Sequence, residues 1–132
     1  MPWNLQLHHD AELIELTYSG IVTPDALIDA FTTAAKLAKE NNILLFLADC
    51  LDMLGGHSVV DLYSLIALFE TLDIAPRSRE ALILPNLKAS LQDVSFYETA
   101  CLNRGYNVKV FKARQEALAW LTEKPVPSAP EK

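Results

Sequence analysis

Apolar and polar positions alternate along the beginning of the chain, with a break at residues 9–12. A period of two places successive side chains on opposite faces of a strand, so each half of the alternation predicts a strand with one buried face. The apolar members of the pattern are Trp3, Leu5, Leu7, Ile14, Leu16 and Tyr18. The two strands and the short polar break between them predict a β-hairpin.

The remaining segments alternate between helical spacing and continuous apolar runs. A hydroxyl at Thr23, a proline at position 24 and an acid at position 25 mark a helix start, and Asn41-Asn42 marks its end. Further helices are predicted over about 59–72, 87–103 and 113–121. Gly105 follows the predicted helix at 87–103 and suits the left-handed conformation that closes many helices.

Three apolar runs predict buried strands between these helices. Ile43–Ala48 has no polar alternation, which is typical of a central strand that is covered on both faces. Ala81–Leu84 and Val108–Phe111 are shorter runs of the same kind. The predicted fold is therefore α/β, with a mixed five-stranded sheet, an antiparallel hairpin followed by parallel strands, right-handed crossovers and about four helices.

Length and charge limit the classes of function. The chain has 132 residues, about half of them hydrophobic, which suits one domain at 1–122. Residues 123–132 are proline-rich and predict a flexible tail. The net charge of −6 opposes binding to nucleic acid, because phosphate backbones attract clustered Lys and Arg. We expect no nucleic-acid partner.

Cysteine usage and the apolar runs indicate the compartment. Cys50 and Cys101 lie inside predicted elements, as buried thiols of a reducing compartment do. The N-terminus lacks a basic and apolar leader pattern, and the longest apolar run is too short for a transmembrane segment. We expect a soluble cytoplasmic protein.

Polar residues gather where the predicted central strand ends. The carboxyl ends of parallel strands meet the amino ends of helices in a crevice that often binds ligands. We interpret this edge as the candidate switch or ligand site. Its members are Asp49, Asp52, Gly55, Gly56, His57, Ser58, Asp61 and Asn86.

Local backbone structure would account for many of these polar residues without any ligand. Ser58 and Asp61 fit a helix capping box, which we favour over any chemistry, and Gly55-Gly56 suits either a tight turn or an anion cradle. Asp49 and Asp52 are most simply turn aspartates that bond their own backbone.

Metal binding and catalysis are the weaker alternatives. His57 with the nearby aspartates, or His8-His9-Asp10, offers metal-ligand chemistry without a recognised spacing. Cys50 and His57 are a nucleophile and a base by residue type, but nothing orients them. We therefore expect no metal, no cofactor and no enzymatic activity.

Three segments resemble the SpoIIAA-like group of the STAS superfamily, which includes bacterial anti-sigma factor antagonists. They are residues 18–27, 43–58 and 110–121, and the resemblance spans roughly residues 3–122. In the antagonists a serine or threonine after the third strand is phosphorylated by a partner kinase, and Ser58 falls at that place. His57 stands where the motif has an aspartate. The resemblance implies a non-catalytic regulatory module that acts through a protein partner, gated at Ser58.

The helix at 59–72 carries more apolar surface than one buried stripe requires. The group resembled here has been likened to lipid-binding CRAL-TRIO domains, which implies a second function as carrier or sensor of a small apolar ligand, with membrane-peripheral association. A homodimer interface or a deeply buried helix would explain the same surface. The candidate residues are Leu62, Tyr63, Ile66 and Phe69.

Overall fold

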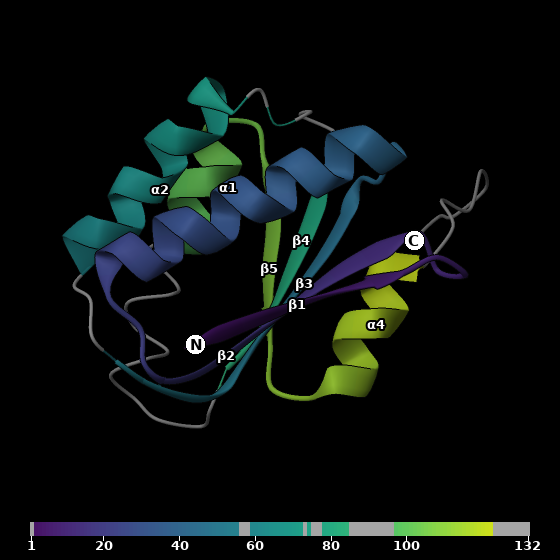
Figure 1. The fold of residues 1–132 in the computed structure, drawn as a ribbon, viewed down its shortest axis with the longest axis horizontal. Helices are drawn as coiled ribbons and strands as arrows, with labels where there is room; N and C mark the ends of the chain where they lie inside the picture. Colours follow the sequence, from purple (N-terminus) through teal and green to yellow (C-terminus); the bar gives the residue numbers. More distant parts are fainter. Residues whose placement is uncertain (1, 56–58, 73, 75–77, 85–96, 123–132) are drawn as a thin grey trace.

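The computed structural model describes residues 2–55, 59–72, 74, 78–84 and 97–122 (Figure 1). The strands are β1 (Trp3–His8), β2 (Leu13–Ile21), β3 (Leu45–Gly55), β4 (Arg79–Ile83) and β5 (Asn107–Phe111). The helices are α1 (Pro24–Asn41), α2 (Val59–Thr71) and α4 (Arg114–Thr122), and residues 97–103 are also helical.

The strands form one sheet in the order β1-β2-β3-β4-β5, so their order in space is their order along the chain. β1 is antiparallel to β2, and each later neighbour pair is parallel. This confirms the predicted mixed sheet and the central place of the apolar run before Asp49. The parallel pairs are connected by helical segments, as a crossover between parallel strands requires.

The helices are distributed unequally over the two faces of the sheet. Figure 1 shows α1, α2 and the helical residues 97–103 on one face and α4 on the other. Small residues line the buried side of α1, which lets the helix approach the sheet closely. These are Ala30, Ala34, Ala35 and Ala38. A smaller core joins α4 to the opposite face, where Ala117 and Leu121 pack against Leu47, Ala81 and Ile83.

The predicted boundaries of α1 are confirmed by its caps. The Thr23 hydroxyl accepts a hydrogen bond from the Ala26 amide at 3.3 Å, and Pro24 occupies the first turn. Asn42 adopts the left-handed conformation, with φ 55°, and its amide donates to the Ala38 carbonyl. The local sequence alone therefore specifies where this helix begins and ends.

The extent of β3 corrects the sequence interpretation. The predicted strand was Ile43–Ala48, but β3 begins at Leu45 and continues to Gly55. β2 runs alongside and pairs Thr17 with Asp49 and Ser19 with Asp52, across two register shifts. The placement of Asp49 and Asp52 in a turn is therefore wrong, because backbone pairing with β2 holds this polar stretch extended. The expectation that these aspartates bond their own backbone is confirmed for Asp49, whose side chain accepts a hydrogen bond from the Leu51 amide.

The other predicted elements are reproduced with small changes at their ends. β4 begins two residues before the predicted start at Ala81, and it ends at Ile83 rather than Leu84. Gly105 adopts φ 87°, as expected for the residue that ends the third helix. The predicted start of that helix at Leu87, and the tail 123–132, lie outside the described residues. Among the described helices, none combines the length and the apolar character needed to cross a bilayer.

Candidate functional site

The candidate edge residues that the structure describes do not converge on one point. Asp49, Asp52 and Gly55 lie on β3, and Asp61 lies in the first turn of α2. The other candidates at this edge lie outside the described residues. They are Gly56, His57, Ser58 and Asn86. The capping box, the anion cradle and the gate at Ser58 therefore stay predictions.

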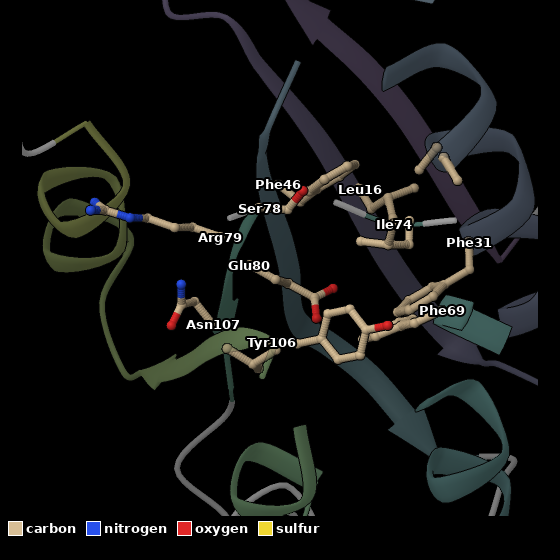
Figure 2. Close-up of a pocket in the computed structure, with 13 residues that line it drawn as sticks. Leu16, Phe31, Phe46, Phe69, Ile74, Ser78, Arg79, Glu80, Tyr106 and Asn107 are labelled. Carbon is tan, nitrogen blue, oxygen red and sulfur yellow. The ribbon is translucent and has the colours of Figure 1, made fainter. Parts of the chain in front are cut away.

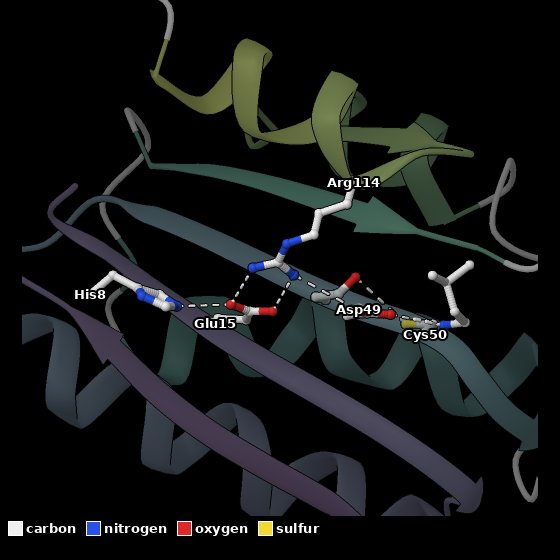
Figure 3. Close-up of polar contacts among 7 residues, drawn as sticks. His8, Glu15, Asp49, Cys50 and Arg114 are labelled. Atoms are coloured by element: carbon white, nitrogen blue, oxygen red, sulfur yellow. Dashed lines mark hydrogen bonds and ion pairs between the residues drawn. The ribbon is translucent and has the colours of Figure 1, made fainter.

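Asp49 faces α4 (Figure 3). One of its oxygens accepts a hydrogen bond from the Leu51 amide at 3.1 Å, and the other lies 3.9 Å from the Arg114 guanidinium. Asp61 belongs to α2, which covers the opposite face of the sheet. Within the part of the chain that the structure describes, no three His, Cys, Asp or Glu side chains are placed to share a metal ion.

Cys50 is placed unfavourably for nucleophilic chemistry. Its side chain is buried on β3, and burial is the largest cause of a pKa raised well above the ordinary value of a thiol. The nearby acids Glu80 and Asp49 raise the pKa further. A thiol in these surroundings stays protonated and unreactive at neutral pH.

Three large apolar side chains are exposed where β2 and β3 end. The exposed fraction is 60% for Ile21, 44% for Leu51 and 76% for Leu54. Ile21 pairs with Gly55, the residue after Leu54, so these two strand ends are neighbours. Single exposed apolar residues are common, but a group at one edge is typical of a contact surface. We name Ile21, Leu51 and Leu54 the carboxyl-edge patch.

A pocket lies at the other end of the parallel strands (Figure 2), and Phe69 is the one residue of its lining that the sequence analysis proposed as a ligand candidate. It is lined by α1, the end of α2 and residues at the start of β4 and β5, and its cavity volume is about 40 Å³. Its apolar lining residues are Leu16, Phe31, Ala34, Ala35, Phe46, Phe69, Ile74 and Val108. A cavity of this size holds a few water-sized groups.

Three aromatic rings from separate elements form one wall of this pocket. Phe31 of α1 stacks on Phe69 of α2, with ring centroids 5.5 Å apart and planes 11° apart. Tyr106, just before β5, meets Phe69 edge-on, with centroids 5.0 Å apart. Such pairs favour fixed geometries, so the wall has a defined shape.

Glu80 is the carboxylate of this pocket (Figure 2). Desolvation by the surrounding protein raises its pKa to about 7. The Tyr97 hydroxyl donates a hydrogen bond to Glu80 Oε1 at 3.1 Å, which acts in the opposite direction. Glu80 is therefore poised between its neutral and ionised forms near physiological pH.

A second apolar cavity of about 50 Å³ lies on the same face of the sheet, toward the carboxyl ends of the strands. Phe31 lines both cavities, and Tyr97 lines the second while bonding Glu80 in the first. Tyr18 also lines the second cavity. Its buried hydroxyl is the one buried side-chain polar atom, among the described residues, that lacks a hydrogen-bond partner.

The opposite face carries an ion-pair network that the sequence analysis also missed (Figure 3). Glu15 of β2 is only 6% exposed, and both of its oxygens accept hydrogen bonds from the Arg114 guanidinium. His8 Nε2 lies 2.8 Å from Glu15 Oε1. The Arg114 hydrogen bonds are the largest cause of a lowered Glu15 pKa, against the opposing effect of burial. The network joins the start of α4 to β2 and is structural in character.

Ile66 and Phe69 are buried beneath α2, in the core between this helix and the sheet. Phe69 additionally reaches the first pocket. Leu62 and Tyr63 belong to α2, but their side chains are outside the described part of the structure. The apolar ligand and dimer interpretations of these four residues stay predictions.

The comparison with solved structures gives the fold. A crystal structure of an uncharacterised protein of the DUF3478 family from Shewanella loihica, with a SpoIIAA-like fold, matches over 90% of this chain and 91% of its own, with a TM-score of 0.60 and 20% identity. The unphosphorylated form of the anti-sigma factor antagonist SpoIIAA matches over 92% of this chain and 99% of its own, with a TM-score of 0.58 and 10% identity. Neither protein-family models nor curated protein sequences match the chain.

Proposed function

We propose that this chain, which has the SpoIIAA-like fold, is a non-catalytic regulatory module that acts by binding a protein partner. The observation that carries the proposal is the carboxyl-edge patch, where three apolar side chains are exposed at the ends of two neighbouring strands. Burying such side chains against a partner releases roughly 25 cal/mol for each Å² of apolar surface removed from water.

The described role of SpoIIAA, a protein with a similar fold, supports a protein as the partner of this chain. SpoIIAA is an anti-sigma factor antagonist, and its solved structure is of an unphosphorylated form. We transfer to this chain only the general mode of action, which is control through contact with another protein. In the sequence, Ser58 lies four residues after Leu54, six after Asp52 and three before Asp61, so a phosphate on it would add negative charge to a segment that is already acidic. The gate at Ser58 is the finer part of the proposal.

We also place the module in the cytoplasm. The support is that Cys50 and Cys101 are both free and buried, as in proteins of a reducing compartment.

The test is a co-purification from the source cells with matched surface variants. Leu54→Asp puts a charge on the patch, and Leu102→Asp puts the same charge on an apolar side chain that is 52% exposed on the helical residues 97–103. We expect a protein that co-purifies with the wild type and with Leu102→Asp but is lost with Leu54→Asp. If every co-purifying protein is retained by both variants, the patch is not the binding surface.

The gate requires a separate pair of variants. Ser58→Asp introduces a negative charge and Ser58→Ala does not. With the co-purified partner in hand, we expect Ser58→Asp to weaken its affinity by about tenfold or more and Ser58→Ala to leave it unchanged. Equal affinity for both variants removes the gate and leaves the patch proposal intact.

A second function, the binding of a small apolar ligand, is favoured by the two cavities beneath α1 and α2. They lie next to each other, with Phe31 lining both, and the unpartnered Tyr18 hydroxyl lines the second. Buried polar groups without a partner are rare in folded proteins and suggest an absent bonding partner. The cavity volumes favour a small ligand over a long acyl chain, which would require the rings to move apart.

Mass spectrometry tests this second function. We expect protein purified gently from its own cells to carry extra mass in native spectra and to lose it on denaturation. A native mass equal to the chain mass, together with unchanged thermal unfolding in the presence of small apolar compounds, would contradict it.

A further inference from the structure

Glu80 has hydrogen-bonding capacity that the described residues do not use. A carboxylate offers about four acceptor positions, and the structure gives the Glu80 side chain one hydrogen bond among the described residues, from Tyr97. Figure 2 shows the Glu80 carboxylate pointing toward the side of the pocket where Tyr106 and Phe69 lie. An ionised carboxylate in apolar surroundings costs free energy unless it is paired. A ligand that donates hydrogen bonds or carries a positive charge would therefore be stabilised at this position.

The described residues around Glu80 do not supply a cation. Arg79 is next in sequence, but its guanidinium points away from the pocket (Figure 2), donates to the Trp120 carbonyl at 3.1 Å and lies 5.6 Å from the centre of the Trp120 ring. The titratable groups that face Glu80 come from β2, β3 and the helical residues 97–103. They are Tyr18, Cys50, Tyr97 and Cys101, all acids that burial keeps neutral at pH 7.

The aromatic wall adds a second preference for positive charge. Ammonium groups are attracted to the faces of aromatic rings, most strongly where water is excluded. Phe31, Phe69 and Tyr106 surround the space into which the Glu80 carboxylate points. A carboxylate on one side and rings on the other suit a cation that carries a short apolar body.

We propose that this pocket binds a small organic ammonium ion, whose charged head pairs with the Glu80 carboxylate and whose apolar body packs against Phe31, Phe69 and Tyr106. The inference rests on the second proposed function and specifies the chemical class of its ligand. The cavity volume of about 40 Å³ limits the body to a few carbon atoms.

Three probes of equal length separate the head-group chemistries: n-butylamine, 1-butanol and butyrate. Each is titrated into the protein labelled for NMR, and binding is located by shifts at residues that line the pocket. We expect the amine to bind about tenfold or more tightly than the alcohol, and butyrate to bind most weakly. Glu80→Gln should reduce amine affinity by about tenfold or more, whereas Glu116→Gln, at an exposed position on α4, should leave it unchanged.

The pH dependence tests the inference on the wild-type protein, which avoids any loss of folding in the variant. The amine stays protonated across neutral pH while Glu80 ionises, so its affinity should rise between about pH 6 and about pH 8, and that of 1-butanol should not. Equal binding of amine and alcohol at the pocket, with no loss in Glu80→Gln, overturns the ammonium inference and leaves the ligand function standing. Absence of binding by all three probes overturns both. If n-butylamine shifts NMR signals only of residues outside the pocket, and does so in Glu80→Gln as well, the amine binds by nonspecific charge attraction. This result also overturns the inference.

Discussion

Removing the charge of Glu15 should destabilise the fold in a pH-dependent way. Glu15 is nearly buried on β2, and Arg114, ninety-nine positions later, holds both of its oxygens at the first residue of α4. α4 is the helix that covers this face of the sheet, so the pair fixes where the helix begins. Glu15→Gln keeps the shape of the side chain and removes its charge.

The magnitude follows from the hydrogen bonds that change. A hydrogen bond to a charged group contributes about 1.5 to 3 kcal/mol, and Glu15 accepts two from Arg114 besides its contact with His8. The Arg114 side chain is 44% exposed, so solvent screening reduces this value. We expect Glu15→Gln to lower the free energy of unfolding by about 2 kcal/mol. Arg114→Met should cost about as much, because it leaves a nearly buried carboxylate with only His8.

Urea unfolding of the wild type, both single variants and the double variant gives the coupling free energy, which should be about 1 to 2 kcal/mol. The folded pKa of Glu15 is lowered from its ordinary value of 4.5 by Arg114. Its contribution is therefore complete above that value and is lost as the pH falls through the folded pKa. The difference between wild type and Glu15→Gln should shrink toward zero in acid. A coupling below about 0.5 kcal/mol, or a difference that is the same at about pH 7 and about pH 3, would refute this reasoning.

Three further outcomes test the interior and the strand end. The folded pKa of Glu80 is about 7, above its ordinary value of 4.5. Wild type should therefore lose about 2 to 3 kcal/mol of unfolding free energy relative to Glu80→Gln as the pH rises from about 5 to about 8. Equal pH profiles in urea unfolding would contradict the desolvation of this carboxylate. Gly55 has φ 112°, and a β-carbon added there would meet open space. Gly55→Ala should therefore lower the free energy of unfolding by about 1 to 3 kcal/mol through backbone strain alone. An unchanged thermal unfolding curve would count against this backbone conformation. Cys50 and Cys101 are buried, and burial raises the pKa of both thiols, to about 12 for Cys101. A thiol reagent should therefore modify them only after denaturation. Rapid labelling of the native protein would show that one of them is accessible.

Patterns between near neighbours in the sequence predicted most of the fold. The alternation before Tyr18 predicted the hairpin, and the cap residues Thr23 and Asn42 lie where α1 begins and ends. The same reasoning failed beyond Ala48, because the extension of β3 depends on pairing with β2 rather than on the apolar pattern. Strand pairing is a property of two segments, so neither segment shows it alone.

The candidate sites were harder to predict for the same reason. The polar stretch after the central strand was visible in the sequence, but the structure places Asp49 beside Arg114 of α4 and Asp61 on α2, and these two helices cover opposite faces of the sheet. The sequence indicated only Phe69 of the pocket around Glu80, because the wall of the pocket comes from three separate segments: α1, α2 and the start of β5. Glu80 itself stands next to an apolar run, as an ordinary acid at the start of a strand would.

Sequence by itself determined the class of fold, the order of its elements, the caps of the first helix and the acidic net charge, since each depends on residue types at short spacing or on composition. Only tertiary structure decided the strand order, the length of β3, the exposure of Leu54, the Glu15–Arg114 pair and the environment of Glu80. These features depend on contacts between segments far apart in the chain, and the free energy of a charged or apolar side chain is set by what surrounds it after folding.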